Sequence, residues 1–176
     1  MTSTIDRDAD RELKARHRAL WASGDYPAVA AELIPTLGPE LVAACGIRRG
    51  QRVLDVGAGS GWTTALLAHL VGSTGSVLGL ELEPELVEFG RANLGRTGQP
   101  WARIEPADPG VLGRPDEAPF DRILVSAEPR ELPTALVDQL ADDAVLVIPV
   151  AGTMLRVTHP GAVVTRHGGY RFVPLR

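Results

Sequence analysis

Short apolar runs alternate with amphipathic segments from residue 52 onward. The apolar runs predict strands at Arg52–Val56, Val77–Glu81, Ala102–Glu105, Arg122–Ser126 and Ala144–Pro149. Segments with a helical period lie between them and predict helices at Trp62–Val71, from Pro84 through Leu94, and at Pro133–Leu140. The tail holds three further stretches typical of antiparallel edge strands: Met154–Thr158, Ala162–Arg166 and Tyr170–Val173. This alternation predicts an α/β fold with an open, mostly parallel, Rossmann-like sheet, helices on both faces and antiparallel edge strands at the C-terminus.

The helical period also predicts which side chains face the core. In the first helix of this region the inward residues are Trp62, Ala65, Leu66 and Leu70. In the second helix the shared face consists of Leu86, Val87, Gly90 and Leu94.

The first 46 residues have a different pattern and predict a helical leader or lid. We expect its helices at Asp6–Ser23, Pro27–Leu33 and Pro39–Cys45, with Gly46 after the last of them. The chain is therefore predicted to be a single domain, in which a leader over residues 1–46 precedes an α/β core over residues 47–176.

Composition narrows the class of protein. The chain has 176 residues, 44% apolar and 23% charged, which is ordinary for a globular domain. A net charge of −4 disfavours binding to a nucleic-acid backbone, and the longest uncharged stretch is too short to span a membrane. The single cysteine, the charged N-terminus and the arginine-rich, lysine-poor composition favour a cytoplasmic, bacterial protein. The histidines show no metal-ligand spacing, so we expect no metal site.

A glycine-rich loop after the first predicted core strand carries the main candidate chemistry. The segment Asp55-Val56-Gly57-Ala58-Gly59-Ser60-Gly61 joins that strand to its helix, and its glycines allow the backbone to approach a ligand closely. A pyrophosphate loop typically reads G-x-G-x-x-G with no acid nearby. Here Gly61 comes one residue early and Asp55 precedes the loop, which favours S-adenosylmethionine, with its ammonium and sulfonium groups, over a dinucleotide. The alternative is a plain strand-to-helix turn.

Two more acids follow neighbouring strands. Glu81 ends the second core strand, where its carboxylate can accept both hydroxyls of a ribose. Asp108 follows the third strand and can accept a hydrogen bond from an adenine amine. The alternatives are a solvated strand-end acid for Glu81 and an acid in a proline-rich turn for Asp108.

These motifs resemble the class I S-adenosylmethionine-dependent methyltransferases, and from Val53 to the C-terminus they resemble the protein-L-isoaspartate O-methyltransferases. The matching stretches are VLDVGAGSGWTTALLAHLVGSTGSVLGLELEPELVEFGRANL, APFDRILVSAEPRELPTALVDQL, AVLVIPVAG and YRFVPL. The resemblance implies a seven-stranded sheet with one reversed strand, and S-adenosylmethionine as methyl donor with S-adenosylhomocysteine as product. The predicted cofactor-binding residues are Asp55, Gly57, Ala58, Gly59, Ser60, Gly61, Glu81, Leu82, Asp108 and Pro109.

The leader resembles a different group. Residues 17–56 are similar to the leader of quinone-biosynthesis-type methyltransferases, with a Trp…Gly-Asp-Tyr…Leu-x-Pro-x-Leu-Gly pattern. The isoaspartate enzymes carry a substrate-facing serine in a Thr-Ile-Ser-x-Pro-like segment, and here the aligned position is Leu37, beside Thr36. We therefore predict slow methylation of isoaspartyl peptides compared with the acceptor that this protein uses best.

The reaction itself needs few residues, so no catalytic residue is assigned. A carboxylate acceptor is already ionised at neutral pH, whereas a phenol, hydroxyl or amine benefits from a base. The predicted acceptor-side residues are Tyr26, Thr36, Ser126 and Glu128, and other candidate bases are His17, His159 and His167. The leading prediction is O-methylation of a carboxylate on a peptide or small metabolite. The alternatives are a small-molecule O-, N- or C-methyltransferase of specialised metabolism, or a non-catalytic binding protein with this fold.

Overall fold

The computed structural model describes residues 45–161, 163–169 and 172–176. These residues belong to one compact unit, Ala43–Arg176. The predicted leader helices Asp6–Ser23 and Pro27–Leu33 lie outside the described residues, as does Pro39–Cys45 except for Cys45 itself.

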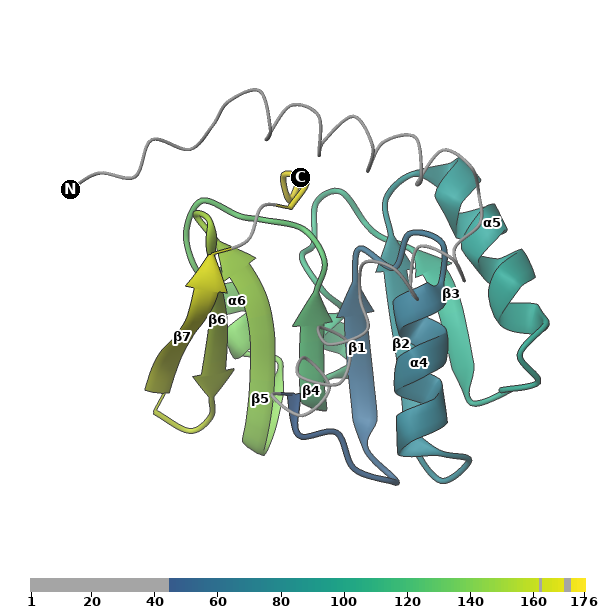
Figure 1. The fold of residues 1–176 in the computed structure, drawn as a ribbon, viewed down its shortest axis with the longest axis horizontal. Coiled ribbons are helices and arrows are strands. Elements are labelled where there is room, and N and C mark those ends of the chain that lie inside the picture. The colour runs from purple at the N-terminus through teal and green to yellow at the C-terminus, as the bar shows by residue number, and fades with distance from the viewer. Residues whose placement is uncertain (1–44, 162, 170–171) are drawn as a thin grey trace. The chain divides into compact units, whose positions relative to one another are not determined.

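A seven-stranded sheet with the order β3-β2-β1-β4-β5-β6-β7 forms the centre of this unit (Figure 1). The strands are β1 (Arg52–Val56), β2 (Ser76–Glu81), β3 (Ala102–Pro106), β4 (Phe120–Val125), β5 (Leu140–Val150), β6 (Thr153–Thr158) and β7 (Val163–Gly169). Strands β1 to β5 pair in parallel, whereas β6 runs antiparallel to both β5 and β7. The predicted open, mostly parallel sheet with antiparallel C-terminal strands is confirmed.

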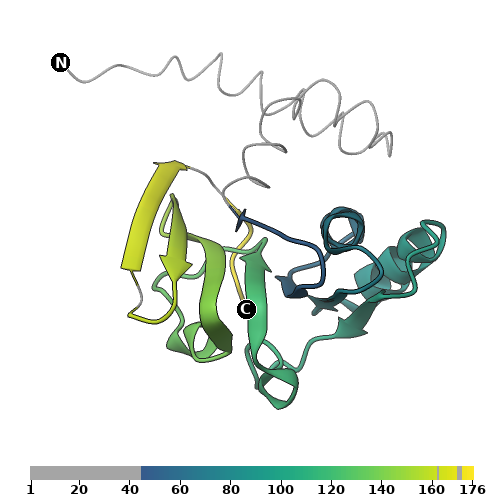
Figure 2. The same cartoon turned by 90° about the horizontal axis from the view of Figure 1, so that it is seen from below.

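Helices cover both faces of the sheet, as predicted. They are α4 (Trp62–Val71), α5 (Pro84–Gly95), the short α6 (Thr134–Val137) and the 3-10 turn η1 (Pro115–Glu117). Figure 2 shows α4 and α6 on opposite sides. Alternate residues of a strand face the same side of the sheet, and on one face Leu54 and Val56 of β1 pack in the same core cluster as Leu136 of α6. On the other face Ile104 of β3 packs with Val87 of α5.

Helix α6 is shorter, and β5 longer, than the predicted Pro133–Leu140 helix and Ala144–Pro149 strand. The side chain of Gln139 explains the difference. Its amide group donates to the carbonyl oxygens of Leu112 and Ala135, and its backbone carbonyl accepts from Phe120 of β4. Because Gln139 bonds to Leu112 and Phe120 outside the helix, α6 ends at Val137 and β5 begins at Leu140.

The predicted tail strands differ in part from the structure. Strands β6 and β7 correspond to the first two, but Phe172 and Val173 of the predicted strand Tyr170–Val173 do not lie in a strand. Their backbone groups bond to Glu128 in the loop after β4, and the only bridge of the described tail residues joins Glu128 to Pro174. The partner of this tail is therefore a loop, which a strand pattern does not reveal.

Two predicted helix faces are partly wrong. Trp62 is 46% exposed and Leu86 is 40% exposed, although both were expected to face inward. The buried residues of α4 are Thr64, Leu67, Ala68 and Val71. The Thr64 hydroxyl donates to Oδ2 of Asp55 at 2.7 Å, so this polar side chain has a partner on the buried side of the helix.

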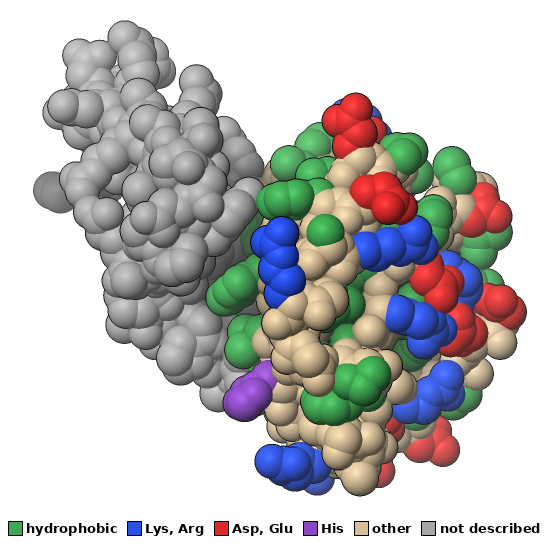
Figure 3. All heavy atoms as spheres, turned by 90° about the vertical axis from the view of Figure 1, so that its right-hand side faces the viewer, with side chains coloured by type: hydrophobic (Ala, Val, Ile, Leu, Met, Phe, Trp, Pro, Cys, Tyr) green, Lys and Arg blue, Asp and Glu red, His purple; other side chains and the backbone are tan. Residues whose placement is uncertain are grey.

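The outer edge of the sheet at β3 carries alternating charges, as Figure 3 shows for the side of the molecule where α5 and β3 lie. Arg103 pairs with Glu105 at 2.7 Å and with Glu117, and Arg114 pairs with Glu105 at 2.9 Å. The hydrogen bond from Arg103 holds the pKa of the Glu105 carboxyl below its usual value. A charged edge strand of this kind discourages pairing with another sheet.

The backbone at the start of α4 lies so close to the backbone of α5 that Gly61 and Gly90 have no room for a side chain. A Cβ atom on Gly61 would lie 2.8 Å from the carbonyl oxygen of Gly90, and a Cβ on Gly90 would lie 2.7 Å from the carbonyl oxygen of Gly59. Gly61 also has a φ of 79°, which favours glycine. Both sides of this contact therefore need glycine.

We predict that Gly90→Ala lowers the free energy of unfolding by about 2 kcal/mol or more, because its methyl group would overlap the Gly59 carbonyl. Gly95→Ala is the matched control in α5, where no atom outside the adjoining residues and the nearby helix backbone lies within 4 Å of an added Cβ. That variant should be neutral or more stable by up to about 1 kcal/mol. Urea unfolding monitored by circular dichroism tests both, and equal midpoints for the two variants would contradict the close contact.

Candidate active site

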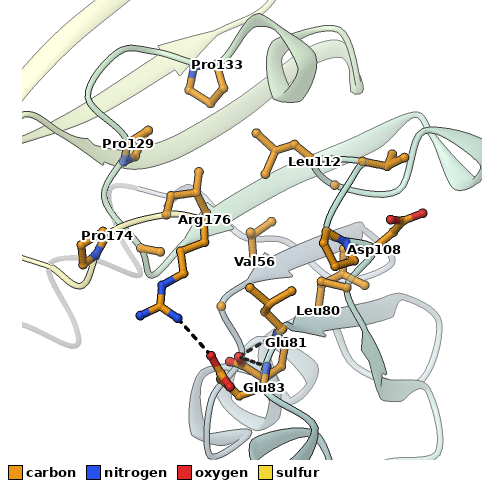
Figure 4. A pocket seen from close by; sticks show the side chains of 18 of the residues that line it. Val56, Leu80, Glu81, Glu83, Asp108, Leu112, Pro129, Pro133, Pro174 and Arg176 are labelled. Atoms are coloured by element: carbon orange, nitrogen blue, oxygen red, sulfur yellow. Dashed lines mark hydrogen bonds and ion pairs between the residues drawn. The ribbon is translucent and has the colours of Figure 1, made fainter.

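A cavity of about 620 Å³ opens at the carboxyl ends of the parallel strands. Its walls come from the ends of β1 and β2, the loop after β3, the loop after β4 and residues 173–176 of the tail. Figure 4 shows Val56 and Leu80 between Asp108 on one side and Pro129 and Pro174 on the other. Ligands of open α/β sheets bind at this edge, so the cavity is the candidate active site.

The carboxylate of Glu81 is fixed at the edge of this cavity by three backbone N–H groups. Its Oε2 accepts from Gly59 at 2.8 Å, and its Oε1 accepts from Leu82 at 2.7 Å and from Glu83 at 3.1 Å. A carboxylate has about four acceptor positions, so Oε2 keeps a position for a ligand hydroxyl. Glu81 thus joins the end of β2 to the glycine loop and still faces the cavity.

The glycine loop contributes to the cavity chiefly through Gly57. Gly57 lines it with a φ of 81°, and its N–H donates to the carbonyl of Leu80 at 2.9 Å. A Cβ on Gly57 would meet only ordinary contacts with Ser126, so its left-handed backbone is what requires glycine. The predicted contacts Ala58, Gly59, Ser60 and Gly61 lie behind this wall, where the loop packs against α5.

The loop after β3 forms the opposite, mostly apolar part of the site. Pro109 and Leu112 of this loop line the cavity, together with Leu82, which directly follows β2. Asp108 lines it too, and its Oδ1 accepts from the Gly110 N–H at 2.8 Å, which shapes the turn. The structure therefore brings together five of the predicted cofactor residues at one cavity: Gly57, Glu81, Leu82, Asp108 and Pro109.

Asp55 lies outside the cavity lining, on the α4 face of the sheet. Its carboxylate is fully buried, and Oδ1 has no hydrogen-bond partner among the described residues. Burial raises the pKa of this carboxyl to about 7, a rise that the Thr64 hydrogen bond opposes and the charge of Glu81 increases. An acid at this position therefore takes up a proton when the chain folds at mildly acidic pH.

None of the predicted acceptor-side residues that the structure describes lines the cavity. Tyr26, Thr36 and His17 lie outside the described residues. Ser126 and Glu128 flank the cavity-lining residue Ala127 but do not line the cavity themselves. The other candidate bases, His159 and His167, are on or beside the β6–β7 hairpin and are likewise absent from the lining.

Both oxygens of the Glu128 carboxylate are used by the backbone. Oε1 accepts from Gly152 at 2.9 Å, and Oε2 accepts from Phe172 at 3.1 Å. The Glu128 carboxylate thus binds backbone N–H groups of the chain itself, and its predicted contact with the methyl acceptor stays a prediction.

Sequence reasoning missed the contribution of the tail. Val173, Pro174, Leu175 and Arg176 all line the cavity, and Arg176 pairs with Glu83 at 3.3 Å across it (Figure 4). The available signal was the Tyr-Arg-Phe-Val-Pro-Leu stretch, which we used for the family resemblance and for a predicted edge strand.

Other kinds of site receive no support within the part of the chain that the structure describes. No group of three or more histidine, cysteine, aspartate or glutamate side chains is arranged to hold a metal ion there. Among the described residues, no helix has the length and hydropathy needed to cross a membrane. Cys45 is a free thiol whose burial raises its pKa to about 11.

The raised pKa of Asp55 leads to a prediction about stability and pH. The folded protein holds this proton more tightly than the unfolded chain, so the contribution of Asp55 to the free energy of unfolding is greatest below about pH 4 and falls as the pH rises to about 7. Asp55→Asn removes the titrating group and keeps an oxygen for Thr64. At pH 8 the variant should be more stable than the wild type by up to about 4 kcal/mol, at about 1.4 kcal/mol for each pKa unit.

Urea unfolding at pH 5 and pH 8 measures this effect, with Asp116→Asn as a control because Asp116 is exposed. A stability difference between Asp55→Asn and the wild type that is the same at both pH values would show that Asp55 does not titrate in this range.

Comparison with known proteins supports the resemblance. The family model described as protein-L-isoaspartate(D-aspartate) O-methyltransferase (PCMT) matches residues 27–176, which include the last 20 residues of the predicted leader. A protein-L-isoaspartate O-methyltransferase of Methanopyrus kandleri is 42% identical over 136 residues, covering 73% of this chain and 60% of that protein. One from Thermococcus onnurineus is 37% identical over 167 residues, covering 88% of this chain and 75% of that protein.

Solved structures of protein-L-isoaspartate O-methyltransferases have a similar fold. A protein-L-isoaspartate O-methyltransferase superposes with a TM-score of 0.74 at 25% identity, over 81% of this chain and 47% of that one. A PCMT from Plasmodium falciparum, solved with S-adenosyl-L-homocysteine, gives 0.69 at 28% identity, over 78% of this chain and 70% of that one. The predicted resemblance is confirmed. This chain belongs to the PCMT family of S-adenosylmethionine-dependent methyltransferases.

Proposed function

We propose that this protein transfers a methyl group from S-adenosylmethionine to a carboxylate of a peptide or protein. Family membership supports this proposal, and the named relatives are isoaspartate O-methyltransferases. The chain spans 60% of the Methanopyrus kandleri relative, so the substrate and the full activity are part of the proposal.

The observation that carries the proposal is the position of Glu81 beside Gly57 at one edge of a largely apolar cavity. Glu81 would accept from a ribose hydroxyl through the acceptor position that its backbone contacts leave open. Leu82 and Pro109 would enclose the adenine, with Asp108 accepting from its amine, and Gly57 would lie along the methionyl part. A pyrophosphate fits less well, because Glu81, Glu83 and Asp108 give the lining three carboxylates.

Beyond binding the donor, the site would have to position the acceptor carboxylate against the methyl group. The bound donor supplies an activated methyl group on its sulfonium, and a carboxylate acceptor is ionised at neutral pH without a base. The described lining contains no histidine, which fits a reaction that needs none. Its proline and leucine side chains exclude water, so the chain contributes alignment and desolvation.

We also propose that the protein acts in the cytoplasm of a bacterium and does not bind nucleic acid. The supporting features are the single free cysteine, the arginine-rich and lysine-poor composition and the net charge of −4.

The test is methyl transfer from labelled S-adenosylmethionine to an isoaspartyl peptide, with the aspartyl peptide of the same sequence as control. We expect label in the isoaspartyl peptide alone, as a base-labile methyl ester, and a slow rate because Leu37 replaces the substrate-facing serine. A base-stable product would favour an N- or C-methyltransferase. No labelling of either peptide, despite binding of S-adenosylhomocysteine, would contradict the isoaspartyl proposal and favour a small-molecule acceptor.

A further inference from the structure

The tail forms a wall of the cavity although it has no strand partner of its own. Residues 173–176 line the cavity from the side of Pro129, opposite the loop after β3 (Figure 4). Two backbone hydrogen bonds attach this tail to the loop after β4: the Glu128 N–H donates to Val173 at 2.7 Å, and the Leu175 N–H donates to the Glu128 carbonyl at 3.0 Å.

The side chain of Glu128 adds a second attachment. Its Oε2 accepts from the Phe172 N–H at 3.1 Å, and its Oε1 accepts from the Gly152 N–H at 2.9 Å. One carboxylate therefore joins three segments: the loop after β4, the turn between β5 and β6, and the first described residue of the tail. Hydrogen bonds to an ionised group are stronger than those between neutral groups, so the carboxylate contributes more than an amide would.

The side chain of Leu175 packs against the main core cluster, whereas the contact of the last residue is weak. Arg176 and Glu83 form an ion pair at 3.3 Å, but their side chains are 72% and 57% exposed. Exposed pairs of this kind contribute little, because solvent screens them and two long side chains lose freedom. The tail is thus held by its contacts with Glu128 and by the packing of Leu175, and only weakly by the Arg176–Glu83 pair.

We propose that Glu128 is a positioning residue of this site, one that acts on the bound ligand only through the tail. Glu128 itself is not part of the cavity lining, whereas its neighbours Ala127 and Pro129 and four residues of the tail are. Loss of its carboxylate frees the N–H groups of Phe172 and Gly152, and the wall formed by residues 173–176 loosens. The effect on ligands in the cavity rests on the proposed function, whereas the attachment of the tail does not.

The experiment compares Glu128→Ala and Glu128→Gln with Glu131→Gln, a control in the same loop whose side chain is exposed and outside the lining. The first readout is hydrogen exchange at the Phe172 and Leu175 amides, and the second is the dissociation constant of S-adenosylhomocysteine by calorimetry. We expect Glu128→Ala to raise both exchange and dissociation constant about tenfold. Glu128→Gln should be intermediate, since its single oxygen can serve only one of the two N–H donors, and Glu131→Gln should match the wild type.

A chain lacking residues 172–176 separates action through the tail from general destabilisation. In that chain Glu128→Ala should weaken S-adenosylhomocysteine binding no further. An equal further loss in the shortened chain, or unchanged exchange at Phe172 in the full chain, would overturn the proposal. Faster exchange with an unchanged dissociation constant would overturn the role of the tail as a ligand wall. A wild-type protein that binds no S-adenosylhomocysteine would contradict the proposed function instead, and the exchange data would still decide whether Glu128 holds the tail.

Discussion

The hydrogen bond from the Gly59 N–H to the Glu81 carboxylate joins two parts of the chain that the sheet only places side by side. Strands β1 and β2 pair in parallel, so the loop after β1 and the acid that ends β2 meet at the same edge. The 2.8 Å contact between them fixes the position of the loop backbone and aims Glu81 at the cavity. The close approach of Gly59 to Gly90 in α5 then supports the loop from behind.

This arrangement divides the motif residues into two groups with different physical demands. Gly57 and Glu81 face the cavity, so the chemistry of a ligand constrains them. Gly61 faces α5, and the close packing of α4 against α5 constrains it instead. Asp55 belongs to neither group, because it lies buried under α4 with Thr64 as its hydrogen-bond partner. A conspicuous sequence motif therefore combines ligand contacts with residues that hold the loop in place.

The sequence predicted the sheet and much of the candidate site because both follow from local patterns. The bounds of β1 and α4 agree with the prediction, since a buried strand followed by glycines and an amphipathic helix gives a strong signal. The inward face of α4 was predicted partly wrongly, because the buried set Thr64, Leu67, Ala68 and Val71 begins with a polar residue whose partner is Asp55. The end of α6 depends on Gln139, which also bonds to Leu112 on a distant segment. The role of the tail was missed for the same reason, since Glu128 is 44 residues before Phe172.

The central claim is that Glu81 is the ligand-binding acid of this cavity as well as the anchor of the glycine loop. The most direct test is calorimetric titration of S-adenosylhomocysteine into the wild type, Glu81→Gln and Glu83→Gln, with amide exchange at Gly59 reporting whether the loop stays in place. A charge-assisted hydrogen bond to the ligand predicts a dissociation constant raised roughly tenfold or more for Glu81→Gln, and little change for Glu83→Gln. An unchanged dissociation constant for Glu81→Gln, with the loop intact, would contradict the account and leave Glu81 as a structural acid.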